Sequence, residues 1–421
     1  MPESFEVAII GAGLVGLATA RALLRARRRS LVVIDAEDQV AAHQSGHNSG
    51  VLHSGLYYSP GSAKAALCRS GRKAMIAFCK ERGIAHEICG KLVVATRPDE
   101  LPRLAALEER GRANGLQGLR RLQANEIQEF EPHAVGLAAL HVPEAGIVDF
   151  PAVAHAMAED VREMGGELRL GERVLDLQVE AATDKARGQA TFPLPASDRA
   201  SARSMRVISS RSAISCSHLV NCAGVRAQVL AKQSGLETPV RILPFRGEYK
   251  MLRDDRKHLV RNLIYPVPDP RFPFLGVHFT RRVDGSIEAG PNAVLALARD
   301  GYRWRDVHLG EMLEFARTPA LWKLGLRHWR TAIGEVHRSL SDKAFALALA
   351  RLLPDIRATD LRPGGSGVRA QALDAHGQML DDFHLEYVKG ATHVLCAPSP
   401  AATASIVIGE EVAQRAGLNG I

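Results

Sequence analysis

The pattern of apolar and polar positions at the start of the chain predicts a strand, a tight turn and a helix. Residues 5–10 are an almost unbroken apolar run, residues 11–16 read Gly-Ala-Gly-Leu-Val-Gly, and residues 17–24 repeat apolar side chains at helical spacing. A second apolar run at residues 31–34 ends at Asp35. Together these segments predict a complete βαβ unit with a carboxylate at the end of its second strand.

The three glycines of this turn fit the backbone of a dinucleotide-binding site. Gly11 permits the tight turn, Gly13 lets the backbone approach a diphosphate, and Gly16 lets the helix pack closely on the strand. The first N–H groups of the helix would face the phosphates, and Asp35 would accept hydrogen bonds from a ribose. An ordinary βα turn can also be rich in glycine, but the flanking strands and the carboxylate favour dinucleotide binding.

Further along the chain, strand-like and helical patterns alternate. Helices are predicted at residues 63–82, 151–164 and 401–416, and strands at residues 91–95, 167–170, 174–177, 219–222 and 392–396. Short alternating runs between turn signals at residues 240–300 predict an antiparallel sheet. A helical region follows at residues 309–353. A segment rich in Ala, Ser, Arg and Pro at residues 183–204 is expected to form a long loop.

Composition limits the class of protein. The chain has 421 residues, 46% hydrophobic and 24% charged, which predicts a globular protein of two or three domains. The net charge is +8, but no basic run is interleaved with aromatic residues, so we expect no nucleic-acid partner. Six cysteines are scattered without a CxxC pair, which is typical of reduced thiols in the cytoplasm.

We expect no membrane span and no targeting peptide. No segment reaches the ~18 continuous apolar residues that a span requires, and only four residues precede the first strand. The expected location is the cytoplasm, with contact at the cytoplasmic face of a membrane left open. Oligomeric state is not predicted.

A polar loop with three histidines follows Asp35. Its small residues and hydrogen-bonding side chains suit a backbone that runs against a large flat ligand. His43, His47 and His53 could instead converge on a metal, but no Cys or carboxylate lies at ligand spacing, so we predict no metal site.

Six separated motifs together resemble one family. They are Gly-Ala-Gly-Leu-Val-Gly at residues 11–16, Gly-His-Asn-Ser-Gly-Val-Leu-His-Ser-Gly at 46–55, Pro-Phe-Arg-Gly-Glu-Tyr at 244–249, Gly-Pro-Asn-Ala at 290–293, Ser-Gly-Val-Arg-Ala-Gln at 366–371 and Ala-Pro-Ser-Pro-Ala-Ala at 397–402. The set resembles the FAD-dependent L-2-hydroxyglutarate dehydrogenases/oxidases of the D-amino-acid-oxidase-like flavoprotein superfamily. The segment at residues 183–204 departs from that pattern.

The resemblance implies an α/β fold with two domains. The first is a discontinuous FAD-binding Rossmann-like domain of the glutathione-reductase type, at residues 1–90, 145–238 and 350–421. The second is an α+β substrate domain built on a mainly antiparallel sheet, at residues 91–144 and 239–349, with a helical segment around 309–349.

The resemblance also implies which residues meet FAD. Asp35 would hold the adenosine ribose, Val174 would meet the adenine through its backbone, and Ala223 and Gly224 would close over the diphosphate. The terminal helix, which begins at Ser399 to Ala401, would direct its N–H groups at the flavin pyrimidine ring, where reduction places negative charge. The full expected set is Gly11, Ala12, Gly13, Leu14, Val15, Gly16, Asp35, Ala36, Gln44, Ser45, His47, Asn48, Ser49, Val174, Ala223, Gly224, Gly365, Gly367, Val368, Ser399, Pro400 and Ala401.

The implied reaction converts L-2-hydroxyglutarate into 2-oxoglutarate by hydride transfer from C2 to N5 of FAD, with oxygen or a quinone-type molecule as the final acceptor. A small dicarboxylate substrate requires cationic partners, and Arg246 and Arg369 are the candidates by motif position. His53 and His278 are the candidates for the base, and Tyr265 is a candidate for holding the substrate.

Other interpretations of these residues remain open. The arginines could form structural salt bridges, and the histidines could form structural hydrogen bonds. The alternative functions are an amino-acid or amine oxidase of the same superfamily and a non-catalytic flavin-binding redox sensor.

One helical stretch carries an apolar stripe with positive charge beside it. Such a stripe belongs either to a helix packed on the core or to a basic helix lying in a membrane interface. The second arrangement would suit a dehydrogenase that passes electrons to a membrane quinone. The stripe consists of Trp322, Leu326, Trp329, Ile333, Val336 and Leu340, and the nearby cations are Lys323, Arg327, Arg330 and Arg338.

Overall fold

The computed structural model describes residues 3–27, 29–180, 204–269 and 275–418, and it divides into two compact units. Unit 1 contains Met1–Gly46, Phe150–Ile242 and Leu380–Ile421, and unit 2 contains His47–Asp149 and Leu243–Met379. Residues 47–90, 145–149 and 350–379, which the sequence grouped with the dinucleotide-binding residues, lie in unit 2 because their strands pair there. The predicted loop at residues 183–204 lies almost entirely outside the described residues.

Unit 1 is built around one sheet. Its strands are β1 (Glu3–Ile10), β2 (Leu31–Ile34), β9 (Glu167–Arg169), β10 (Val174–Glu180), β11 (Ser204–Ser209), β12 (Ala213–Asn221), β19 (His384–Val388) and β20 (Ala391–Cys396). Within the described ranges the order is β10-β11-β12-β1-β2-β9, with β20 beside β12 and β19 beside β20. β20, β12, β1, β2 and β9 are parallel, as a dinucleotide-binding sheet requires.

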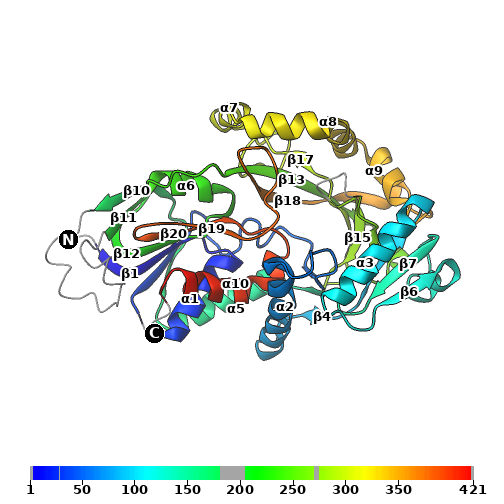
Figure 1. Cartoon of the computed structure of the whole chain (residues 1–421), viewed down its shortest axis with the longest axis horizontal. Helices are drawn as coiled ribbons and strands as arrows, with labels where there is room; N and C mark the ends of the chain where they lie inside the picture. Colours follow the sequence, from blue (N-terminus) through cyan, green and yellow to red (C-terminus); the bar gives the residue numbers. More distant parts are fainter. Residues whose placement is uncertain (1–2, 28, 181–203, 270–274, 419–421) are drawn as a thin grey trace. The chain divides into compact units, whose positions relative to one another are not determined.

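The helices of unit 1 pack against one another and against this sheet. They are α1 (Leu14–Ala26), α5 (Phe150–Glu163), α6 (Ala227–Gln233) and α10 (Ala401–Arg415). α1 contacts both α5 and α10, and the three helices lie together in Figure 1. A methyl group at Gly409 of α10 would overlap the Ala18 backbone of α1, and Arg21 pairs with Asp160 of α5. This close packing holds the start of α1 beneath the end of β1, and the predicted strand, turn and helix are confirmed.

Unit 2 contains a large and a small sheet. The large one is formed by β5 (Lys91–Ala95), β6 (Arg120–Gln123), β7 (Ala138–Val142), β13 (Arg241–Leu252), β14 (Leu263–Pro266), β15 (His278–Arg281), β16 (Ile287–Gly290), β17 (Val294–Leu295) and β18 (Leu361–Leu373), and the small one by β3 (Val51–Leu52), β4 (His86–Glu87) and β8 (Gly146–Val148). Over the described residues the large sheet runs β17-β13-β16-β15-β14-β5-β7-β6, with β18 on β13. The antiparallel pairing predicted for residues 240–300 is confirmed, and β14 also pairs in parallel with β5.

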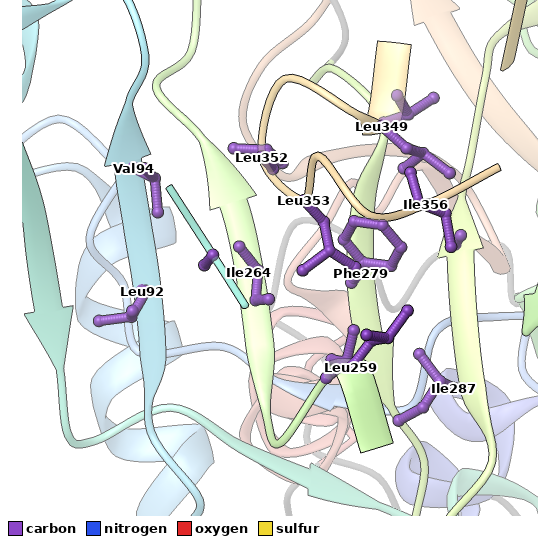
Figure 2. Packing of buried hydrophobic residues seen from close by; sticks show 14 of the residues in the cluster. Leu92, Val94, Leu259, Ile264, Phe279, Ile287, Leu349, Leu352, Leu353 and Ile356 are labelled. Carbon is purple, nitrogen blue, oxygen red and sulfur yellow. The ribbon is translucent and has the colours of Figure 1, made fainter. Parts of the chain in front are cut away.

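Unit 2 also contains helices, and apolar residues at the end of the last one and just after it belong to the same buried cluster as central strands of the large sheet. The helices are α2 (Ala63–Glu81), α3 (Leu101–Ala113), α4 (Ile127–Phe130), α7 (Leu309–Ala316), α8 (Pro319–Leu340) and α9 (Asp342–Leu349). Figure 2 shows Leu353 beside Ile264 of β14 and Phe279 of β15; Leu349 and Leu352 belong to the same cluster, and all five are buried. This core therefore anchors the two strands that carry Tyr265 and His278.

The apolar stripe of α8 faces solvent. The exposed fractions are Trp322 61%, Leu326 78%, Trp329 54%, Ile333 61%, Val336 38% and Leu340 70%. The interpretation of this stripe as a core-packing face is therefore wrong, because the helix attaches through other residues, including the buried Ala320 and Leu324. Across the residues that the structure describes, every helix is too short or too polar to cross a membrane.

Candidate functional site

The glycine turn of unit 1 leaves no room for side chains. Gly11 has φ +109°, and a Cβ there would lie 2.5 Å from the carbonyl oxygen of Cys222. A Cβ at Gly16 would overlap the carbonyl oxygen of Gly11, and one at Gly13 would lie 2.9 Å from Ser45 Oγ. Each glycine is thus required by a close backbone approach, as the sequence predicted.

Polar groups at this turn are arranged around the start of α1. The N–H groups of Ala12 and Glu37 donate to Asp35 Oδ2 and Oδ1, at 2.6 and 2.9 Å. Leu14 N donates to Ser45 Oγ at 2.9 Å. An ionised carboxylate has about four acceptor positions, so Asp35 retains capacity for ribose hydroxyls. The next N–H groups of α1, including those of Val15 and Gly16, have no intrahelical partner and suit a diphosphate.

Three loops meet at the same edge of the unit 1 sheet. β1, β12 and β20 are parallel neighbours, so their carboxyl ends lie together. Ala223 and Gly224 follow β12, and a Cβ at Gly224 would lie 2.6 Å from Gln44 Oε1. The structure brings these residues together with the glycine turn, and the fit to a dinucleotide is good. Of the other expected residues in unit 1, Ala36 follows Asp35 and Val174 opens β10 opposite Ser209. Ala401 is the first residue of α10, Pro400 is its N-cap, and Ser399 comes just before.

The remaining expected cofactor residues lie in unit 2. His47 Nδ1 lies 3.0 Å from the carbonyl oxygen of Ser366, and a Cβ at Gly367 would overlap the carbonyl oxygen of His47. The structure therefore brings the residues 46–55 motif against the residues 366–371 motif. The other members are placed alongside: Asn48 accepts from Gly50 N at 2.9 Å, Val368 is buried, Ser49 is half-buried and Gly365 is exposed.

Tyr265 and His278 form a stacked pair on neighbouring strands of unit 2. Their ring centroids are 3.9 Å apart, at an interplanar angle of 28°. His278 Nδ1 lies 2.8 Å from the carbonyl oxygen of Gly276, which can only accept, so Nδ1 carries the proton and Nε2 of the neutral ring is an acceptor. The pKa of His278 is lowered to about 3, chiefly by burial and to a smaller extent by the charges of Arg369 and Lys91, while the bond to Gly276 acts in the opposite direction. The ring is neutral near pH 7.

His53 lies near enough to His278 for their charges to interact, and we call these residues and Tyr265 the histidine cluster. His53 is half-buried, and its pKa is lowered to about 3, chiefly by burial and to a smaller extent by the charges of Lys91, His278 and Lys64. Both histidines that the sequence proposed as bases are therefore neutral and able to accept a proton.

Lys91 and Tyr57 also lie beside Tyr265 in this cluster, and neither was predicted from the sequence. The Lys91 ammonium lies 4.4 Å from the ring centroid of Tyr57 and 4.8 Å from that of Tyr265. Burial lowers the pKa of Lys91 to about 7, with the Cys68 thiol acting in the opposite direction, and raises the pKa of Tyr57 well above its ordinary value. The feature of the sequence that could have identified Lys91 is its position as a lysine at the start of an otherwise apolar strand, residues 91–95.

The two candidate arginines have different surroundings. Arg246 is fully buried, stacks on Trp304 at 4.5 Å, and places Nε and Nη2 at 3.1 and 3.0 Å from Glu248 Oε1. Its Nη1 has no hydrogen-bond partner within the described ranges. Arg369 is half-buried, and its Nη1 donates to the Asn292 carbonyl at 3.4 Å. Its charge acts on His278 and Tyr249, which associates it with the histidine cluster.

Comparison with known proteins places the chain among flavoenzymes. The family described as "DAO: FAD dependent oxidoreductase" matches residues 6–415. The L-2-hydroxyglutarate dehydrogenase of Indibacter alkaliphilus is 45% identical over 97% of this chain and 98% of its own length. The human mitochondrial L-2-hydroxyglutarate dehydrogenase is 41% identical over 98% of this chain and 89% of its own. These relatives match the family that the motifs indicated.

Solved structures share the fold at low sequence identity. An L-alpha-glycerophosphate oxidase from Mycoplasma pneumoniae with FAD bound has a TM-score of 0.74 and 19% identity, covering 98% of this chain and 94% of that one. A glycine oxidase from Geobacillus kaustophilus has a TM-score of 0.69 and 19% identity, covering 98% and 95%. The predicted fold class is confirmed by this likeness.

Proposed function

Because the chain belongs to the FAD-dependent oxidoreductases, and within them to the L-2-hydroxyglutarate dehydrogenases, we propose that it oxidises L-2-hydroxyglutarate to 2-oxoglutarate. FAD is its cofactor, and the glycine turn, Asp35 and Ser45 fit that group. The observation that carries the proposal is similarity along nearly the whole length of both this chain and its relatives. Further support comes from the cluster around His53 and His278, where the neighbouring positive charges belong to Lys91 and Arg369.

The reaction removes two electrons and two protons from the substrate alcohol. FAD, when bound, accepts the hydride that leaves C2. The protein must remove the hydroxyl proton as the C2–O bond becomes a carbonyl. We propose that oxygen or a quinone takes the electrons afterwards.

His278 is the base that the geometry favours, with His53 as the second candidate. Its Nδ1 proton is held by the Gly276 carbonyl, so Nε2 presents a lone pair. Stacking on Tyr265 fixes the ring plane, and we propose that Tyr265 also lines the bound substrate. The low pKa of His278 in the free protein keeps this base unprotonated. A bound dianionic substrate would raise the pKa of His278 toward the working pH.

Arg369 is the arginine that we propose for the carboxylate beside C2. A guanidinium fixes the plane of a carboxylate as well as its charge, which orients the reacting carbon. Arg246 is the other candidate, but Glu248 already balances its charge at 3.0 Å. Its role as a buried structural ion pair, left open by the sequence, is supported by that contact.

Anaerobic mixing of the FAD-loaded protein with single substrates tests the function. L-2-hydroxyglutarate should bleach the flavin absorbance and yield 2-oxoglutarate. L-glutamate tests the amine-oxidase alternative, and a flavin that no substrate bleaches would indicate the redox sensor. Equal rates with the D enantiomer or with L-lactate would contradict the assignment.

We also propose that the exposed face of α8 binds an anionic membrane surface, at the cytoplasmic side, where a quinone acceptor would be reached. Support comes from the six exposed apolar residues of the stripe, two of them Trp, and from Lys323, Arg327, Arg330 and Arg338 on the same helix, against the single acidic residue Glu335. Leu309, Leu313 and Leu347 extend the exposed apolar surface onto α7 and α9. The positive charge favours lipid over a second copy of this equally basic helix.

Vesicle co-sedimentation tests this contact. The wild-type protein should bind vesicles containing phosphatidylserine at low salt, and Trp322→Ala with Trp329→Ala should release it while the flavin spectrum is retained. Leu175→Ala, at an exposed apolar position of unit 1, is the matched control and should bind normally. Wild-type protein that ignores the vesicles, or that buries the stripe in a dimer detected by light scattering, would refute the proposal.

A further inference from the structure

Lys91 is a buried amine whose ammonium form has no acidic partner among the residues that the structure describes. Its side chain is 2% exposed, and its ammonium contacts the rings of Tyr57 and Tyr265. Among the described residues no carboxylate lies within 4.0 Å of it. A buried ammonium is costly unless a counter-charge compensates it, and contacts with two aromatic rings supply only part of that compensation.

Several other buried cations are paired with carboxylates, whereas the buried Arg29 donates to the carbonyl oxygen of Leu418 at 2.8 Å. Arg21 pairs with Asp160, Arg246 with Glu248, and Arg299 with Glu311. Lys91 differs from these three arginines, because no carboxylate among the described residues pairs with its ammonium. A cation that is left unpaired in the free protein is suited to an anion that arrives later.

The groups around Lys91 supply no negative charge. Burial raises the pKa of the Cys68 thiol to about 12, so it is neutral near pH 7. His53 and His278 are neutral, and Tyr57 carries a buried hydroxyl without a hydrogen-bond partner in the described part of the chain. The cluster thus contains an unpaired ammonium and an unused hydroxyl donor, which together match one carboxylate.

We propose that Lys91 binds the C5 carboxylate of the substrate and so makes the site selective for dicarboxylates. This inference rests on the proposed function. An ammonium is a compact point charge that does not fix the plane of its partner, whereas the guanidinium of Arg369 does. Plane-fixing matters beside the reacting C2 and not at the far end of the substrate, which assigns C1 to the arginine and C5 to the lysine.

Substitution at Lys91 gives a direct test with two substrates that differ only at C5. L-2-hydroxypentanoate carries a methyl group where L-2-hydroxyglutarate carries its second carboxylate. Lys91→Met should lower kcat/KM for L-2-hydroxyglutarate by roughly 10- to 150-fold, as expected for a hydrogen bond between charged groups, and should leave the pentanoate unchanged. Lys91→Arg should retain part of the preference. The surface variant Lys80→Met is the control.

Two outcomes overturn the inference. Equal losses with both substrates would place Lys91 at the reacting end or in a structural role, and an unchanged ratio would remove it from substrate binding. Flavin absorbance and thermal unfolding of each variant show that it is folded and loaded. Wild-type protein that L-2-hydroxyglutarate fails to reduce would instead refute the proposed function.

A binding measurement on the wild-type protein is independent of turnover and of any variant. Glutarate should bind more tightly than pentanoate, and calorimetry in two buffers should reveal proton uptake with glutarate above pH 7, because burial holds the pKa of free Lys91 at about 7. His53, His278, Cys68, Tyr57 and Tyr265 face the same ammonium, and none of them should take up this proton with pentanoate. Equal affinity for the two ligands, or no difference in proton uptake, would contradict the proposal.

Discussion

Neutral, buried His278 should make the folded protein lose stability in mild acid. Its pKa falls from 6.5 to about 3 on folding, chiefly because of burial. Between these two values the unfolded chain takes up a proton that the folded chain does not. The stabilisation is therefore complete above pH 6.5 and is lost as pH falls below it.

The magnitude follows from the two pKa values. At pH 5 the unfolded imidazole is almost fully protonated and the folded one is not, which costs about 2 kcal/mol of unfolding free energy relative to pH 8. This free-energy cost depends little on the pKa of His278 in the folded protein, since a folded pKa one unit higher would still lie well below pH 5.

Urea unfolding at pH 8 and pH 5, with FAD in excess, measures this loss. His278→Gln keeps a donor for the Gly276 carbonyl but cannot titrate, so its loss between the two pH values should be smaller than that of the wild type by about 2 kcal/mol. His376→Gln, at an exposed position, is the control and should match the wild type. A His278→Gln variant with the full wild-type pH dependence would show that the imidazole is not held neutral by burial.

Three further substitutions test the fold and the cofactor site. Phe279→Ala should destabilise unit 2 by roughly 3–5 kcal/mol in urea unfolding, because Phe279 is fully buried beside Leu353 (Figure 2); a loss below about 1 kcal/mol would contradict that packing. Gly16→Val should give protein that lacks flavin absorbance, since a Cβ there overlaps the Gly11 carbonyl, and normal loading would refute the steric argument. Ser45→Ala should weaken FAD binding in a fluorescence titration while lowering stability by about 1 kcal/mol, since it removes the hydroxyl that accepts a hydrogen bond from Leu14 N.

The elements that sequence predicted best are those whose pattern is local. The glycine turn, the apolar strand before it and the helix after it follow from adjacent residues, and the steric need for Gly11 and Gly16 was correctly foreseen. The strand at residues 91–95 was predicted with the bounds that β5 has, Lys91–Ala95.

Long-range packing determined what the sequence could not predict. Lys91 becomes a buried cation only because Tyr57 and Tyr265, from distant segments, close around it. The sequence around a polar residue at the start of a strand does not show whether its side chain is solvated or enclosed by the fold. The stripe of α8 was ambiguous for a related reason, because helical periodicity shows that one face is apolar and not what covers it.

Flavin reduction by C2-deuterated L-2-hydroxyglutarate is the most direct test of the central claim. Under anaerobic single-turnover conditions the unlabelled L enantiomer should bleach the flavin with one equivalent of 2-oxoglutarate formed, and deuterium at C2 should slow the bleaching because that bond breaks. An unbleached flavin, or bleaching at the same rate by the D enantiomer, would contradict the assignment.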